Sequence, residues 1–269
     1  LDKFRHATTP PGAKKIVEPF SFAAMTSHSE RLREAEFNVV KDYFSPELRV
    51  LELGGGNGFQ ALLIDARGCQ VSSIDVAPPS QGIQHFPVQG YDGRAIPYPS
   101  DEFDLIFSSN VLEHIDDLDA TLRESLRVLK SDGVAIHILP TPAWRLWTSL
   151  AHYGYLLQRV LDADRPVGDG SVPSLTEKMH SRGMIYAVRR VLAAGPHGRY
   201  PGALSELYYF SEGRWLKVFQ RAGFRVMQAK ASDIFYTGYG LLPRLSLSTR
   251  RSMARWLGAA TRIYVLRKA

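Results

Sequence analysis

Short apolar runs alternate with helical stripes through the first half of the chain. Apolar runs at 50–53, 71–75, 103–108 and 134–139 predict buried strands, stripes at 61–66 and 118–129 predict helices between them, and 130–133 predicts a turn. Ahead of the first strand, Ser29 can cap a helical stripe that stops before Pro46. Strands that alternate with helices in this way predict an α/β protein with a parallel sheet and helices on both faces.

The pattern changes after Pro140. Helical signals at 143–161 and 174–194 flank a polar stretch at 162–173, and a loop rich in Gly and Pro follows at 195–202. Ser211 can cap a helix that ends at Gly223, and apolar runs at 224–227 and 263–266 predict two late strands. We predict an irregular N-terminal segment at 1–28 and a single domain over 29–269. Within that domain, 141–207 is predicted to be an inserted lid that binds the acceptor over the carboxyl ends of the strands.

Composition narrows the class of protein. The chain has 269 residues, of which 45% are hydrophobic and 22% charged, so disordered and collagen-like proteins are excluded. Cys69 is the single cysteine, which excludes an intrachain disulfide and a cysteine-based zinc cluster. The chain shows neither a signal-peptide-like start nor an apolar run long enough for a membrane span. We therefore expect a cytoplasmic protein, and a peripheral contact with the inner face of the membrane stays open.

Charge is unevenly distributed along the chain. The net charge is +6, but residues 1–140 carry −7 and residues 141–269 carry +13. Between Arg244 and Ala269 there are seven basic residues and no acidic one. Such asymmetry is typical of a surface that faces nucleic acid or membrane, of a site for an anionic acceptor, or simply of a solvated basic face.

A glycine loop follows the first predicted strand directly. Its sequence is Glu52-Leu53-Gly54-Gly55-Gly56-Asn57-Gly58. Glycines let the backbone turn tightly and approach a ligand closely. Asp75 stands at the end of the second strand, where a carboxylate can accept hydrogen bonds from ribose hydroxyls. The loop and this acid together predict a nucleoside cofactor.

Spacing and charge decide which cofactor fits best. A dinucleotide fingerprint that starts at Gly54 would need glycine at position 59, where the chain has Phe59. Glu52 would repel a pyrophosphate but suits a cation. S-adenosylmethionine carries a sulfonium and an ammonium and no phosphate. The electrostatics therefore favour S-adenosylmethionine over NAD.

Several motifs together resemble those of class I S-adenosylmethionine-dependent methyltransferases. They are the segment 50–58, Asp75, Asp92-Gly93, 96–98, 103–106 and 110–114. The similarity is greatest to the small-molecule subgroup of ubiquinone-type, methyltransferase-11-like enzymes; it spans 45–140 and is recognisable again over 206–230. It implies a Rossmann-like fold with a seven-stranded, mostly parallel sheet, a reversed last strand, and a helical lid inserted between strands 5 and 6.

The resemblance also implies where the cofactor binds. Glu52 and the backbone of 54–58 would face its methionine portion. The residues implied for the remainder are Asp75 at the ribose hydroxyls, Val76 beside the adenine, Asp92 and Gly93 at the adenine edge, and Asn110 between cofactor and acceptor.

Methyl transfer requires alignment of the reactants and, for a hydroxyl acceptor, a base. His197 in the glycine-rich loop and His114 after the fourth strand are the candidate catalytic residues; an amine or carbanion acceptor would need neither. Asp116, Asp117 and Asp119 follow the fourth strand, but they fit better as the solvated start of the next helix. We therefore expect no metal.

The acceptor is the least determined feature. Aromatic residues over 144–157 and arginines after 244 favour O-methylation of a glycan, a glycolipid or another small hydroxylated acceptor. The alternative enzyme methylates a quinone-like, lipophilic ring. A nucleic-acid methylator or binder lacks an Asn/Asp-Pro-Pro-Tyr/Phe motif after the fourth strand, so no stable nucleic-acid partner is expected. A non-catalytic cofactor-binding scaffold is disfavoured because no motif is broken. The oligomeric state stays open.

Overall fold

One seven-stranded sheet organises the chain, in a computed structural model that describes residues 27–78, 82–161, 194–239 and 242–269. The strand order is β3 (Gln89–Gly90), β2 (Gln70–Asp75), β1 (Arg49–Leu53), β4 (Phe103–Ser109), β5 (Leu129–Pro140), β7 (Thr261–Lys268) and β6 (Phe224–Ala231). Strands β1 to β5 pair in parallel, whereas β7 runs antiparallel to both β5 and β6. The predicted α/β fold with a reversed last strand is confirmed.

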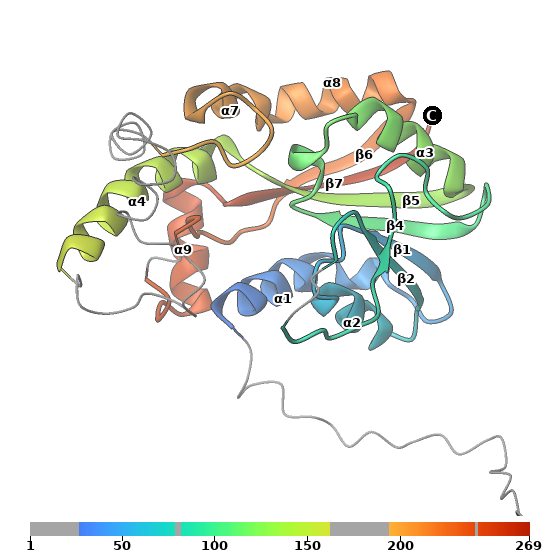
Figure 1. Cartoon of the computed structure of the whole chain (residues 1–269), viewed down its shortest axis with the longest axis horizontal. Helices are drawn as coiled ribbons and strands as arrows, with labels where there is room; N and C mark the ends of the chain where they lie inside the picture. Colours follow the sequence, from blue (N-terminus) through green and yellow to red (C-terminus); the bar gives the residue numbers. More distant parts are fainter. Residues whose placement is uncertain (1–26, 79–81, 162–193, 240–241) are drawn as a thin grey trace, which may run out of the picture.

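Helices cover both faces of the sheet (Figure 1). α1 (His28–Val40) and α2 (Phe59–Asp65) lie on one face, and α3 (Leu118–Val128) and α8 (Glu212–Ala222) lie on the other. Because successive strand residues point to opposite faces, Val50 packs under α1 and α2 while its neighbour Leu51 packs under α3 and α8. The central strands are thus buried on both sides.

Three further helices gather beyond the carboxyl end of β5 (Figure 1). α4 (Pro142–Leu161) begins directly after β5, α7 (Ala203–Tyr209) packs against α4, and α9 (Leu247–Leu257) lies between β6 and β7 in the sequence. The insertion between β5 and β6 therefore contains α4 and α7. The predicted polar stretch at 162–173 and nearly all of the helical signal at 174–194 lie outside the described residues, as do residues 1–26.

The first helix begins two residues earlier than predicted. Ser27, rather than Ser29, is the N-cap: its hydroxyl accepts from the Glu30 amide at 3.2 Å, and its own amide donates to the Glu30 carboxylate at 2.6 Å. This reciprocal pair is a capping box, which needs Glu three residues after the cap. The spacing from Ser27 to Glu30 provides that geometry and decides where the helix begins.

The predicted turn at 130–133 is wrong, because β5 already begins at Leu129. Leu129 pairs with Phe103 and Val134 with Leu105, so four residues of β5 lie opposite the single residue Asp104 of β4, and Lys130 bonds Asp104 at 2.6 Å. The irregular pairing lets a polar, glycine-containing stretch continue the strand. The short strand β3 and helices α7 and α9 were not predicted.

Within the described parts of the chain, no helix is both long enough and apolar enough to cross a membrane.

Candidate functional site

A cleft of about 650 Å³ opens at the carboxyl ends of β1, β2 and β4. Many of the predicted site residues line it, namely Gly54, Asp75, Val76, Asp92, Gly93, Asn110 and His114. The remaining predicted cofactor residues, Glu52, Gly55, Gly56, Asn57 and Gly58, belong to the end of β1 and the loop after it and are not among the lining residues of the cleft. The structure therefore brings together residues that are up to 60 positions apart in the sequence.

The glycine loop is fixed to β2 and leaves one side open. The amides of Gly54 and Gly55 donate to the Ile74 carbonyl at 2.8 and 3.1 Å. Gly54 has φ +74°, and a Cβ there would lie 2.3 Å from Val111, so only glycine fits. Gly56 also has a positive φ, but a Cβ there would meet nothing within 4 Å. The loop thus packs tightly against the protein at Gly54 and has free space at Gly56.

Glu52 lies buried beneath this loop. Its carboxylate accepts a 2.6 Å hydrogen bond from the Ser73 hydroxyl, and a Cβ at Gly55 would lie 3.0 Å from the same carboxylate oxygen. Burial raises the pKa of Glu52 to about 7, against the opposing effect of the Ser73 bond. A positive charge placed above the loop would favour the ionised form.

Asp75 stands at the end of β2 with both oxygens turned to backbone donors. One oxygen accepts from Gly56 at 2.9 Å and the other from Ala77 at 3.0 Å. Each carboxylate oxygen can accept a second hydrogen bond, so the group can still bind hydroxyls in the cleft. Val76 is 62% exposed beside it, and this apolar surface suits the face of a flat ring.

Another part of the cleft is lined by Asp92, Gly93 and Asn110. One oxygen of Asp92 accepts from the amides of Arg94 and Ala95 at 2.9 and 3.3 Å, and these bonds lower the pKa of the carboxyl. Its second oxygen has no such bond. Asn110 has φ 55°, a conformation that Asn tolerates better than most residues, and its backbone N–H donates to the Ile138 carbonyl at 2.8 Å. This part of the cleft therefore presents a carboxylate oxygen and a side-chain amide.

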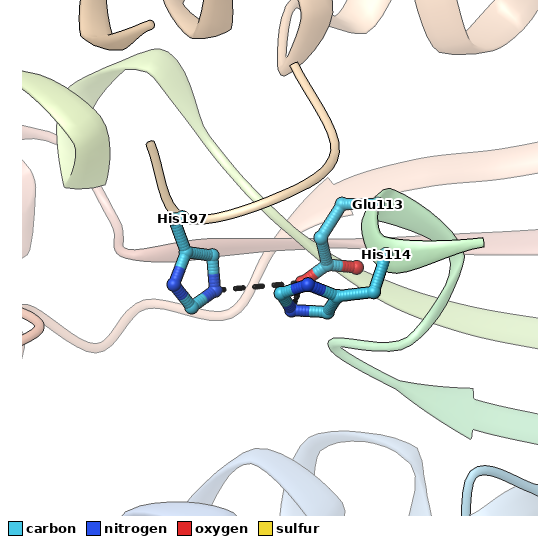
Figure 2. Close-up of side chains that lie close together, drawn as sticks. All are labelled: Glu113, His114 and His197. Atoms are coloured by element: carbon cyan, nitrogen blue, oxygen red, sulfur yellow. Dashed lines mark ion pairs between the residues drawn. The ribbon is translucent and has the colours of Figure 1, made fainter. Parts of the chain in front are cut away.

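The two candidate catalytic histidines lie side by side at one end of the cleft (Figure 2). The ring centroids of His114 and His197 are 4.8 Å apart, although 83 residues separate them in the sequence. His114 ends the short helix η3 (Leu112–His114), and the ring of His197 packs on Trp144 of α4. None of the described insertion residues lines the cleft. His197 contacts the cleft residue His114 but does not itself line the cleft.

Glu113 completes this cluster. One carboxylate oxygen lies 3.8 Å from Nε2 of His114 and 3.9 Å from Nε2 of His197. Burial raises the pKa of Glu113 to about 8 and lowers the pKa of His114. Burial also lowers the pKa of His197 to about 4, with smaller contributions from His114 and Arg145. Both shifts favour the unprotonated form of the two imidazoles.

A buried ion pair holds the His197 loop in place. One oxygen of Glu206 accepts from the amides of His197 and Gly198, both at 2.7 Å, and the other lies 3.1 Å from Nε of Arg145. Arg145 also donates to the Gly195 carbonyl at 2.9 Å. The sequence reasoning missed Glu113, Glu206 and Arg145. Of these three residues, only Glu113 could have been suspected from the sequence, because it directly precedes the candidate histidine His114.

A second pocket of about 990 Å³ lies between α4, the segments 235–239 and 242–245, and α9. Its lining is largely aromatic and aliphatic and includes Trp147, Tyr155, Phe235, Tyr239, Met253 and Arg244. Tyr236 of this pocket donates to Glu36 at 2.7 Å, and Arg33 bonds both Glu36 and the cleft residue Ser109 at 2.9 and 3.4 Å. A short chain of polar contacts thus connects the pocket with the cleft.

We expect Glu206→Gln to destabilise the protein by about 3–5 kcal/mol, because it leaves the buried Arg145 charge without its partner. Chemical denaturation measures the change. Glu212→Gln is the matched control, since Glu212 pairs with Arg262 at 3.1 Å on the surface and should cost only about 0–1 kcal/mol. Equal losses in the two variants would contradict a structural role for the buried pair.

Comparison with known proteins identifies a family and several relatives. A family model described as a methyltransferase domain matches residues 25–229. A 2-methyl-6-phytyl-1,4-hydroquinone methyltransferase of Oryza sativa subsp. japonica is 32% identical over 108 residues, 37% of this chain and 31% of the relative. A malonyl-[acyl-carrier protein] O-methyltransferase of Halorhodospira halophila is 34% identical over 98 residues, 33% of each chain.

A solved structure shares the fold at low sequence identity. It is a SAM-dependent methyltransferase from Methanosarcina mazei, with a TM-score of 0.50 and 13% identity over 86% of this chain and 96% of that chain. The chain spans about a third of the length of the curated relatives it matches.

Proposed function

The chain belongs to the methyltransferase-domain family, whose methyl donor is S-adenosylmethionine, and we propose that it methylates a hydroxyl oxygen on an acceptor that carries an apolar portion. The observation that carries this proposal is the pair of unprotonated imidazoles, His114 and His197, at the edge of the cleft. A hydroxyl acceptor must lose its proton, and these groups are the candidates to take it.

The cleft fits the donor. The space at Gly56, the exposed Val76 and the carboxylates of Glu52 and Asp75 suit the cationic methionine portion, the adenine and the ribose of S-adenosylmethionine. We propose that Asp92, Gly93 and Asn110 bind the adenine edge and the acceptor side, as the family resemblance implies. When bound, S-adenosylmethionine supplies an activated methyl group; the protein orients the acceptor and excludes water.

The large apolar pocket supports an acceptor with a lipophilic part. Its aromatic lining suits a lipid chain or the face of a sugar, and the exposed Arg244 can meet a phosphate group. Glycolipids and lipid-linked glycans combine these features with free hydroxyls. A quinone-like ring is the second candidate, because the pocket is apolar and one relative is named as a hydroquinone methyltransferase.

Exposed apolar and basic side chains surround this pocket. Trp256 on α9 is 89% exposed beside the exposed Arg255, Arg251 on the same helix is also exposed, and so are Leu150 and Leu157 on α4. Amphipathic tryptophan and arginine favour a membrane interface. We therefore propose that this face, which would receive a lipid-linked acceptor, makes a peripheral contact with the membrane.

The affinity for S-adenosylmethionine should rise with pH. Because the pKa of Glu52 is about 7 in the free protein and a cation favours the ionised carboxylate, the Kd should fall as pH rises from 6 to 8 and then level. At pH 6 the Kd should be about tenfold weaker than at the plateau. Calorimetry across this range measures the effect. Glu52→Gln should bind S-adenosylmethionine more weakly, and its Kd should lose the part of the pH dependence that comes from Glu52. Any pH dependence that remains in this variant then belongs to other groups, such as the ammonium of the ligand. A pH profile identical to that of the wild type would exclude Glu52 as the titrating group.

His197→Ala and His114→Ala should each lower kcat by at least about 100-fold, because a proton acceptor or ligand for the acceptor hydroxyl is lost. The Kd for S-adenosylmethionine should stay within about twofold, since the donor portion of the cleft is intact. Transfer of labelled methyl groups to a glycolipid fraction and to quinols measures activity, with His28→Ala as control. Label recovered as a methyl ether supports the proposal, whereas label found only on ring carbon would reverse the order of the two acceptors.

Binding to vesicles of phosphatidylglycerol and phosphatidylcholine should depend on α9. Trp256→Ala and the double change Arg251→Gln with Arg255→Gln should each weaken cosedimentation several-fold, because apolar insertion and attraction to anionic headgroups both contribute. Leu204→Ala on α7, at a residue 83% exposed, is the matched control. Equal weakening by the control would argue against α9, and steep salt-dependent binding to RNA in its place would favour the nucleic-acid alternative.

A further inference from the structure

Glu113, His114 and His197 offer three ligand atoms that all lie within 4.8 Å of one another (Figure 2). Metal–ligand bonds of about 2.0–2.2 Å place neighbouring ligand atoms about 3.0–3.5 Å apart. The two measured distances to the Glu113 oxygen, 3.8 and 3.9 Å, exceed this spacing by less than one ångström. Small side-chain rotations would therefore close the three atoms around an ion.

Glu113 is the member of this cluster that most needs a partner. Its side chain is 0% exposed, and among the described residues neither carboxylate oxygen has a hydrogen-bond partner from another side chain or residue. The other buried carboxylates of the described chain are paired: Glu36 with Arg33, Tyr236 and Thr261, Glu52 with Ser73, and Glu206 with Arg145 and two amides. A buried carboxylate without a donor is costly, and such groups are normally paired or coordinate a metal.

We propose that Glu113, His114 and His197 form a binding site for one divalent transition-metal ion. Two imidazoles and one carboxylate favour Zn²⁺, Co²⁺, Mn²⁺ or Fe²⁺ over Mg²⁺ and Ca²⁺, which prefer oxygen ligands alone. Three protein ligands leave at least one coordination position for another group. Since His114 also lines the cleft, that position borders the place where the acceptor would bind.

The backbone supports this arrangement from both sides. A Cβ at Gly198 would lie 2.5 Å from the Glu113 carbonyl, so glycine is required for the His197 loop to approach. The amide of Arg199 donates to the same carbonyl at 3.1 Å, and Glu206 holds the amide of His197. The carboxylates considered from the sequence have another role: Asp117 caps α3 by accepting from Ala120 at 2.9 Å. The proposed ligands are thus a different set, held by three separate contacts.

The inference rests on the proposed O-methylation for its role in the reaction. An ion at this position would bind the acceptor oxygen and lower the pKa of the hydroxyl, and its proton would pass to solvent water. His114 and His197 would then act as ligands and would not take the proton directly. Metal binding itself does not depend on the acceptor, so the two proposals can fail separately.

The test uses the full, tag-free chain after treatment with a chelator, without donor or acceptor. We expect Co²⁺ to bind at a one-to-one ratio and give visible absorption bands of a nitrogen- and oxygen-ligated ion, with Zn²⁺ displacing it and raising the melting temperature. Glu113→Gln, His114→Ala and His197→Ala should each weaken binding at least about tenfold. His114 is partly exposed, so His114→Ala should fold even if Glu113→Gln does not.

His85→Ala is the matched control, because His85 also pairs with a glutamate, Glu30, at 2.9 Å and lies outside the cluster. Unchanged Co²⁺ binding in this variant supports the assignment. The inference is overturned if no ion binds at up to millimolar concentration, or if the three cluster variants bind as the wild type does. Full methyl transfer by enzyme from which the chelator has removed metal would also overturn the role of the ion. The proposal that a histidine takes the proton of the acceptor hydroxyl directly would then remain. Metal binding without any O-methylation would overturn only the proposed reaction.

Discussion

Parallel pairing of β1 with β2 and β4 is the constraint on which the rest of the molecule depends. It buries these strands on both faces and brings their carboxyl ends to one edge, so the chain must turn there without regular partners. The glycine loop, Asp75 and Asn110 occupy those three ends. A polar cleft at this edge therefore follows from the sheet itself, and the antiparallel β7 lets the chain close the sheet on the far side of β5.

Local pattern predicted the strands and the cofactor side of the cleft, because both are encoded within short windows. Three features stand close together in the sequence: the apolar run of β1, the glycines after it, and Asp75. Once β1 and β2 are known to be neighbours in the sheet, the cleft-lining residues among them are expected to lie together. The pairing of Glu206 with Arg145 joins two positions 61 residues apart, and the contact of Glu113 with His197 spans 84. The hydrophobic periodicity of a short segment carries no information about contacts between residues so far apart in the sequence. The start of β5 was missed for a related reason, since its polar residues 130–133 continue the strand only through an irregular pairing with β4.

The charge asymmetry of the chain acquires a spatial meaning in the fold. The acidic half contributes the carboxylates that surround the cleft, where a cationic donor fits. The basic half contributes α4, α9 and the last two strands, and two of its arginines, Arg244 and Arg250, line the apolar pocket. Arg145 and Arg250 are buried and bind backbone carbonyls, so part of the excess positive charge supports structure and is not a surface for partners.

The buried carboxylates show how stability and chemistry compete at this site. Leaving a buried polar group unpaired costs about 1–3 kcal/mol, a sizeable part of a total stability of about 5–15 kcal/mol. Glu36, Glu52 and Glu206 avoid that cost through bonds within the fold. Among the described residues, Glu113 lacks such a bond from another residue, while Glu206 and Gly198 hold an imidazole beside it. The proposed metal ion would supply this carboxylate with the partner that the other buried acids of the described chain find within the fold.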